Sequence, residues 1–432
     1  MKPQVSSSVP IRPSALAEAI FRREIVPWAL LGLSLGLVEG ATAAVLVKRH
    51  FASVVSPFHL NLAVGLVSGA PALSNVVSFV WANVAHGRER VRLMVGLQAV
   101  FALLVGLVSL ASREMSGLVL TVASVMLARS VWAGVLTVRA AVWTSNYPRN
   151  VLARITGRIV VVSSLAVAAS AALVGWTLED GALDPRWVYG GGAIAGLVAA
   201  WLYRETRVRR QFRLLHAETS SGPRGQPFNL AMLRRILAED PSFREYMFWM
   251  GLFGAGNLML IAQLVVIFAD HLHLSSGVQI GLLAVVPLVA LPFFTPWWAR
   301  HFDGSHIVVY RARQGWALVL ATLITCLATF TGWLPLLWIG AIMLGAANAG
   351  ANLGWNLGHN DFASIGRAQH YMGVHVTLTG VRGAIAPPLG ILFYEALEAF
   401  HRGAGRYALL LPLALTTAGA IGFNLMRREL QK

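Results

Sequence analysis

Three ionisable side chains, Glu39, Arg129 and Arg382, stand deep inside long apolar runs of this sequence. A charge exposed to hydrocarbon is costly, so such residues turn toward protein or water and commonly mark the path of an ion or substrate. By helical rise, Glu39 lies about 21 Å along its run from Ile25, and Arg129 lies about 26 Å from Asn146 at the end of its own run. The two residues therefore share a depth, which permits an ion pair.

Two interpretations of a Glu39–Arg129 pair stay open. A carboxyl group that gains and releases a proton as the conformation changes is a coupling device, and we assign this proton-coupling role to Glu39. A permanently ionised pair would instead hold its part of the molecule together. Trp132, one turn beyond Arg129, either stacks on a bound ligand or fills the core.

Carboxamides recur at four-residue steps in a later run, at Asn348, Asn352 and Asn356, and so share one face of a helix. His359 returns to nearly the same face. A bare amide in hydrocarbon is strongly unfavourable. The stripe therefore faces either a water-filled path, where it would bind a solute, or a neighbouring helix with which it forms hydrogen bonds.

A third group of polar residues, His375, Thr379 and Arg382, shares one face of the next run. Arg382 lies near the middle of the membrane by helical rise, and the second half of the chain has no acid at that depth. Its expected partners are an anionic ligand, Asn257, Gln263 or Glu39. His375 either carries a proton near neutral pH or is a hydrogen-bonded structural residue.

The elements that must position these groups follow from the composition. Of 432 residues, 56% are hydrophobic and 12% are charged, whereas about a quarter of the residues in an average soluble protein carry charge. The chain is therefore a polytopic membrane protein. Its net charge of +16 is explained by topology and by anionic lipid headgroups, which disfavours nucleic acid as a partner. The single cysteine, Cys326, permits no intrachain disulfide.

A transmembrane helix needs about 20 apolar residues, and twelve runs approach or exceed that length. Lipid cannot satisfy open backbone groups, so these runs must form helices. The predicted fold is all-α, with twelve transmembrane helices. Their predicted ranges are 25–47, 57–82, 93–111, 117–145, 156–178, 187–203, 246–270, 277–299, 308–332, 334–357, 369–395 and 405–426.

Lysine and arginine indicate the orientation. With the N-terminus inside, the cytoplasmic segments hold 26 of these residues and the opposite loops hold 6. Both termini are therefore expected in the cytoplasm, and the expected location is the inner or plasma membrane of a bacterium. The expected parts are a tail (1–24), a six-helix bundle (25–203), a basic linker (204–245) with a surface helix at 230–238, a second six-helix bundle (246–426) and a tail (427–432).

The two bundles repeat several features of sequence. Three ordered pairs of matches indicate a duplication into two six-helix pseudo-repeats. This is the layout of many secondary transporters, whose substrate site lies at the midplane between the halves. The matched residues are Glu24 and Trp28 with Glu245 and Trp249, Trp81 and Gly87 with Trp298 and Gly304, and Trp143 with Trp355, at offsets of 221, 217 and 212 residues.

The chain resembles the major facilitator superfamily over nearly its whole length. The signature turn of that family follows the second helix and has the form Gly-x-x-x-Asp-Arg-x-Gly-Arg; here Asn83 stands near the expected Asp, followed by Gly87 and Arg88. The matching turn of the second half keeps Asp303 and Gly304. The resemblance implies that these turns gate the movement of the halves and that spans 1 and 4 line a central cavity.

We therefore expect a secondary active transporter of a small polar or anionic organic solute, working by alternating access with proton coupling. The expected partners are the substrate, the lipid bilayer and protons, without a cofactor or a metal, and we expect a monomer. The alternatives are a transporter-like receptor or scaffold that binds without translocating, and a uniporter without ion coupling. The expected substrate-binding residues are Arg129, Trp132, Asn257, Gln263, Asn348, Asn352, Asn356, His375 and Arg382.

Two other classes of protein are disfavoured. The sequence has no Gly-x-x-x-x-Gly-Lys-Ser/Thr loop, so ATP does not drive the protein directly. A metalloenzyme is disfavoured because His370 and His375 are five residues apart and point away from each other on a helix.

Overall fold

The computed structural model describes residues 15–180, 183–209, 211–212, 215–216, 230–363 and 367–431. Within these ranges every regular element is a helix, and ten helical stretches are long and apolar enough to cross a membrane. The bent pair α1–α2 supplies an eleventh crossing. Helix α8, 19 residues long, packs beside α1 and α5 and completes the set of twelve. The predicted all-α fold with twelve spanning helices is confirmed.

The helices of the first half follow one another with short connections. Their bounds are α1 (Ala15–Leu37), α2 (Gly40–His50), α3 (Pro57–Leu73), η1 (Ser74–Val77), α4 (Ser78–Ala85), α5 (Arg90–Leu107), η2 (Val108–Leu110), α6 (Met115–Asn146), α7 (Arg149–Asp180) and α8 (Pro185–Tyr203).

The second half follows the linker helix α10 (Leu230–Glu239), which lies where the sequence predicted a surface helix. The remaining bounds are α11 (Pro241–Asp270), α12 (Ser276–Ile280), the π-helical turn η3 (Gly281–Val285), α13 (Val286–Phe302), α14 (Ile307–Thr331), α15 (Leu334–Leu357), η4 (Gly358–Asp361), α16 (Ala368–Phe400), η5 (Ala404–Leu409) and α17 (Leu410–Leu430).

Span 1 is broken, whereas the sequence predicted one continuous helix. It bends by 40° between α1 and α2, and Glu39 stands at the bend with an extended backbone (φ −69°, ψ 139°). The small residues of the span pack on different helices on the two sides of this bend. A Cβ on Gly32 would lie 2.6 Å from Ser163 O of α7, whereas a Cβ on Gly40 would lie 2.7 Å from Ser68 O of α3.

The two halves share one scheme of helix packing. In the first half, α1 packs on α7 and α8, and α5 packs on α6 and α8. In the second half, α11 packs on α16 and α17, and α14 packs on α15 and α17. Because spans 1, 3, 4, 5 and 6 of the first half correspond in order to spans 7, 9, 10, 11 and 12, the predicted pair of six-helix repeats is confirmed.

A hydrogen bond is also repeated between the halves. Trp81 Nε1 donates to Ser130 O, and Trp298 Nε1 donates to Ala346 O, each at 2.7 Å. In both halves a glycine four residues beyond the acceptor faces the indole ring, leaving room for it. The match of Trp81 with Trp298 made from the sequence is therefore a match of structural positions.

The match of Trp143 with Trp355 is out of register. Trp143 Nε1 donates to Glu24, whereas Trp355 Nε1 donates to Thr379, and the repeated indole bond aligns α6 with α15 at an offset of 216 residues rather than 212. In the remaining pair of matches, Glu24 is fully buried and Glu245 is partly buried. Tryptophan is common at any helix end, so its spacing alone does not set the register.

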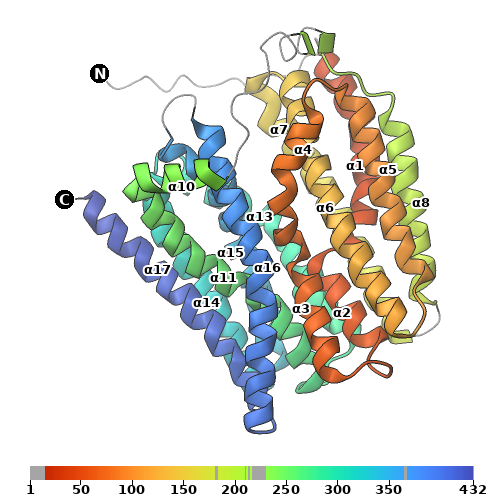
Figure 1. Cartoon of the computed structure of the whole chain (residues 1–432), viewed down its shortest axis with the longest axis vertical. Coiled ribbons are helices and arrows are strands. Elements are labelled where there is room, and N and C mark those ends of the chain that lie inside the picture. The colour runs from red at the N-terminus through yellow and green to blue at the C-terminus, as the bar shows by residue number, and fades with distance from the viewer. Residues whose placement is uncertain are drawn as a thin grey trace.

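The halves pack closely at one end of the molecule. We call the end at which α1 begins and α17 ends the terminal face, and the opposite end the distal face. Close packing between the halves joins α2, α3, η1 and α7 to α11, α12, η3, α13 and α16. Among the described helices, α1, α4 and α6 make no comparable contact with the second half. Figure 1 shows α14 and α17 leaning away from α1 and α5 toward the terminal face.

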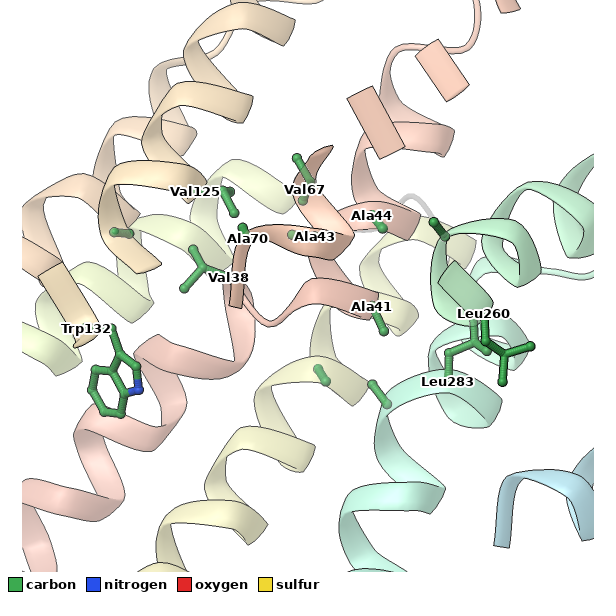
Figure 2. Packing of buried hydrophobic residues seen from close by; sticks show 14 of the residues in the cluster. Val38, Ala41, Ala43, Ala44, Val67, Ala70, Val125, Trp132, Leu260 and Leu283 are labelled. Carbon is green, nitrogen blue, oxygen red and sulfur yellow. The ribbon is translucent and has the colours of Figure 1, made fainter. Parts of the chain in front are cut away.

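Small side chains allow the close approach at the distal seam. Figure 2 shows Ala41, Ala43 and Ala44 of α2 in the same packed cluster as Leu260 and Leu283 of the second half. Such residues bring helix backbones together within a membrane. The same holds where α3 meets α16: a Cβ on Gly69 would lie only 2.5 Å from the backbone oxygen of a glycine on α16.

Candidate functional site

Glu39 and Arg129 are in contact across the first half. Arg129 Nη1 lies 3.0 Å from Glu39 Oε2, with the Arg129 side chain 9% exposed and the Glu39 side chain 30% exposed. Glu39 precedes the first residue of α2, so its carboxylate lies at a helix N-terminus, which favours negative charge. The carboxylate makes no capping bond to α2; it accepts a hydrogen bond from the Arg129 guanidinium on α6 instead. The break in span 1 thus creates the position from which Glu39 reaches Arg129.

Trp132 lies in the aromatic interior of the first half. It is 4% exposed, and its ring centroid lies 6.3 Å from that of Trp28 and 5.1 Å from that of Phe101. This placement favours the alternative in which Trp132 fills the core. Figure 2 shows its indole apart from the distal seam.

Arg382 has partners other than those expected from the sequence. Arg382 Nη2 donates to Thr379 Oγ1 at 2.6 Å, and Arg382 Nη1 donates to Met250 O of α11. Gln263 donates instead to Gly390 O at 2.9 Å. Within the described residues Arg382 thus contacts neutral acceptors nearby, and the expectation that it pairs with Asn257, Gln263 or Glu39 is wrong. Asn257 itself is partly buried on α11.

His375 is enclosed one turn from Thr379. It is 1% exposed, and neither ring nitrogen has a hydrogen-bond partner among the residues that the structure describes. The ring of Trp355, on α15, lies 5.5 Å from the imidazole, and Trp355 Nε1 donates to Thr379 Oγ1 at 3.2 Å. The polar face of α16 predicted from the sequence therefore lies against the end of α15 nearest the terminal face.

The asparagine stripe of α15 lies in the half of that helix nearest the terminal face. Asn352 and Asn356 are exposed, Asn348 is partly buried, and Asn356 Nδ2 donates to Asn352 O of its own helix at 2.7 Å. The exposed residue Ile339 lies across the helix axis from Asn348 and Asn352, whereas the exposed residue Ile342 lies only about 40° around the axis from Asn356. The exposure of Asn352 and Asn356, and the bond of Asn356 within its own helix, favour a hydrated wall over hydrogen bonding to a neighbouring helix.

The two turns predicted to gate the halves have the same backbone form. Gly87 follows α4 with φ +65°, and Gly304 follows α13 with φ +74°. Glycine adopts this left-handed conformation without steric cost, which explains its presence at both turns. Arg88 and Asp303 are exposed, and Asn83 is partly buried near the end of α4.

A polar network lies at the distal seam, and the sequence did not predict it. Lys48 Nζ lies 2.7 Å from Asp270 Oδ2 and donates to Asn61 Oδ1 at 2.6 Å. Asn61 Nδ2 then donates to Glu395 Oε1 at 2.6 Å, so α2 and α3 are joined to α11 and α16. Lys48 and Asp270 are 222 residues apart, close to the repeat offset at span 1. This offset could have predicted the pair, because residues at equivalent positions of two repeats lie close together when they are near the pseudo-two-fold axis.

Helix α10 is held on the terminal face by ion pairs. Glu239 Oε1 lies 2.6 Å from Arg235 Nε, and Glu239 Oε2 lies 3.0 Å from Arg367 Nη2. The Arg235 guanidinium, helped by Arg367, lowers the pKa of Glu239. Tyr371 of α16 donates to Asp240 at 2.9 Å beside them. The linker is therefore fastened to the start of α16.

Comparison with known proteins supports the fold seen here. The family model for the Major Facilitator Superfamily matches residues 25–387. A mutant of the nucleoside transporter NupG is similar in structure, with a TM-score of 0.73 at 11% identity over 94% of this chain and 99% of that one. A D-xylose-proton symporter has a TM-score of 0.70 at 12% identity over 95% and 97% of the two chains.

A third solved structure is a bacterial homologue of the human lysosomal transporter Spinster, in an inward-facing, unoccupied conformation. It has a TM-score of 0.63 at 12% identity and covers 96% of this chain and 98% of that one. A search of the curated proteins finds no match for the sequence. The family model covers well over half of the chain and agrees with the helix order. The chain therefore belongs to the major facilitator superfamily.

Proposed function

We propose that this integral membrane protein is a secondary active transporter of a small polar or anionic organic solute, working by alternating access. The observation that carries this proposal is the asymmetric contact between the halves, which are packed at the distal face and diverge toward the terminal face. The excess of basic residues predicts that the terminal face is cytoplasmic. On that assignment the protein is in an inward-facing state, and both termini lie in the cytoplasm.

The proposed solute path runs between the halves. Arg129, Asn348, Asn352, Asn356 and Arg382 contribute the polar groups along it, with Asn257 on α11 beside them. Trp132 and Gln263 support the walls from within, because both are buried among their own helices. The D-xylose-proton symporter and the nucleoside transporter are named for polar solutes, and this supports a polar cargo here.

Proton coupling is assigned to Glu39. Its carboxylate is paired with Arg129 but remains 30% exposed, so a proton has access to it in this conformation. Protonation would remove the charge that Arg129 attracts and so loosen α2 from α6. Because α2 also packs against the second half, this change would bear on the closure of the distal face.

The test begins with a screen of a metabolite panel by thermal stability, since a ligand of the folded state raises the unfolding temperature. The strongest ligand is then followed into proteoliposomes with and without an imposed pH gradient, for the wild type, Glu39→Gln and the exposed control Glu89→Gln. We expect the gradient to accelerate uptake severalfold in the wild type and control, and to have no effect in Glu39→Gln.

Equal gradient dependence in the wild type and Glu39→Gln would remove the coupling role of Glu39. Uptake that ignores the gradient in every form would indicate a uniporter. A ligand that binds tightly but is never taken up would indicate a receptor or scaffold, and the transport proposal would fail.

A further inference from the structure

Two arginines inside the second half have no acidic partner among the described residues: Arg311, which is fully buried, and Arg382, which is partly buried. In the first half Arg129 is paired with Glu39, and at the seam Lys48 is paired with Asp270. Within the described residues, Arg311 and Arg382 have only neutral hydrogen-bond acceptors. Burying a cation without a counter-charge is costly, and two such cations near each other also repel.

Arg311 is fully buried between α14 and α15. Its Nη1 donates to Gln314 Oε1 at 2.8 Å, and its Nη2 donates to Ala351 O at 3.3 Å. Its Nε has no hydrogen-bond partner within the described part of the chain. A Cβ on Gly354 would lie 2.8 Å from the Arg311 Cζ atom, so glycine leaves the space that the guanidinium occupies. We did not expect a binding role for Arg311 from the sequence, because it lies near the start of its span.

Three other polar groups around Arg311 are also incompletely bonded. Arg382 Nε, both ring nitrogens of His375 and the hydroxyl of Tyr246 are buried without hydrogen-bond partners in the described structure. A Cβ on Gly358 would lie 3.2 Å from the Tyr246 hydroxyl, and the His375 ring lies 5.5 Å from that of Trp355, so both groups lie at the same end of α15 as Arg311. These groups come from α11, α14 and α16, which surround the end of α15, so unused polar atoms converge from three helices on one region.

We propose that Tyr246, Arg311, His375 and Arg382 form an anion-binding site inside the terminal-face end of the second half. Guanidinium groups bind carboxylate and phosphate through charge-assisted, often bidentate, hydrogen bonds. The ligand is therefore the carboxylate or phosphate group of a small molecule, or a resident inorganic anion of the same chemistry. If the ligand is a small molecule that the protein transports, the inference rests on the proposed function and narrows the substrate class to anions.

Anion binding is measured on the purified full-length protein by thermal unfolding. Potassium phosphate, acetate and chloride are titrated separately at constant ionic strength, so that screening does not change. We expect phosphate or acetate to raise the unfolding temperature with a saturable dependence on concentration. Arg382→Gln and Arg311→Gln should each weaken this binding at least about tenfold, because each removes charge-assisted hydrogen bonds to the anion.

The matched control is Arg313→Gln, which removes an exposed charge two residues from Arg311 on the same helix. It should bind anions as the wild type does. Arg382→Lys keeps the charge but loses the planar pair of donors, and we expect intermediate affinity. The proposal is wrong if none of the three anions raises the unfolding temperature saturably. It is also wrong if both glutamine variants leave that increase unchanged.

The difference in stability between Arg382→Gln and the wild type should change sign with anion concentration, which distinguishes loss of binding from poor folding. Without added anion, Arg382→Gln relieves repulsion with Arg311, so its stability should equal or exceed that of the wild type. At saturating anion the wild type should become the more stable protein. If Arg382→Gln is less stable by the same amount at every anion concentration, Arg382 is structural and the site is wrong.

Uptake measurements distinguish a transported anion from a resident one. Proteoliposomes are given radiolabelled phosphate or acetate, whichever binds. Uptake that Arg382→Gln abolishes identifies the anion as cargo. Saturable binding without uptake identifies a resident anion, in which case the site stands while the transport proposal is judged by the pH-gradient experiment alone.

Discussion

Glu39 and Arg129 illustrate how position along a helix controls the chemistry of a single residue. The carboxylate lies at the break in span 1, at the N-terminus of α2, and its contact with Arg129 is 3.0 Å. Arg382, in the second half, has only neutral hydrogen-bond acceptors among the described residues. The chemical difference between the two halves is therefore a difference in counter-charge.

Removing one member of the Glu39–Arg129 pair should destabilise the protein more than removing both. Arg129→Gln leaves the carboxylate unpaired, and the pair is only partly buried. We expect a loss between about 1 kcal/mol, typical of exposed pairs, and about 3–5 kcal/mol, typical of buried ones. The double variant with Glu39→Gln should recover most of it.

The measurement is thermal unfolding of the four forms of this double-mutant cycle in detergent, with Arg113→Gln as an exposed control. Additive losses in the double variant would mean that the two side chains do not interact.

Among the elements, α10 is a linker helix that has a defined docking place. Glu239 joins Arg235 of its own helix to Arg367, and Asp240 accepts a bond from Tyr371 of α16. Since α16 also packs on α3 across the seam, the linker is attached to a helix that must move if access alternates.

The attachment of α10 should weaken in acid. The pKa of Glu239 is lowered from its usual value of 4.5, so the ion pairs contribute fully above that value and are lost as the pH falls through the lowered pKa. Protection of the α10 amides against hydrogen exchange, measured relative to the intrinsic exchange rate at each pH, should therefore be high at pH 7 and lower once the pH falls through the lowered pKa. Glu239→Gln should show low protection of α10 at both pH values, and wild-type protection of α10 that does not change with pH would contradict this role.

In the whole molecule, the distal seam is closed by residues that repeat symmetry brings together. Lys48 and Asp270 occupy nearly equivalent positions of the two halves and carry opposite charges. Asn61 and Glu395 extend the contact to α3 and α16. A like-charged pair at this point would disfavour the closed distal face, which is the face that must open in the alternate state.

Reversing either charge should shift the molecule toward opening at the distal face, and reversing both should restore closure. The measurement uses Cys326→Ala, which removes the buried native thiol, together with Asn356→Cys on the exposed stripe. We expect thiol labelling at position 356 to slow in Lys48→Asp or Asp270→Lys as the state open at the terminal face becomes less populated; a change of about 1.4 kcal/mol alters the ratio of the two states about tenfold.

Labelling in the Lys48→Asp/Asp270→Lys double variant should return to the original rate. Arg49→Asp, an exposed neighbour on α2, is the matched control. Equal labelling in the single and double variants would show that the pair does not govern closure.

The sequence by itself determined the helical crossings, because hydrophobic length and the need to satisfy backbone groups are local properties. Membership of the family was likewise visible in the order of spans and in the turns at Gly87 and Gly304, whose left-handed backbone demands glycine. The common depth of Glu39 and Arg129 was accessible from helical rise alone.

Only the tertiary structure decided which polar groups meet. The bend at Glu39 depends on glycine packing against α7 and α3, and the partners of Arg382 depend on how closely α11 approaches α16. The surroundings of Arg311 and of the Lys48–Asp270 pair are set by contacts between helices that are distant in sequence. Such contacts depend on register and rotation about each helix axis, which hydrophobicity constrains only weakly when lipid and protein interior are equally apolar.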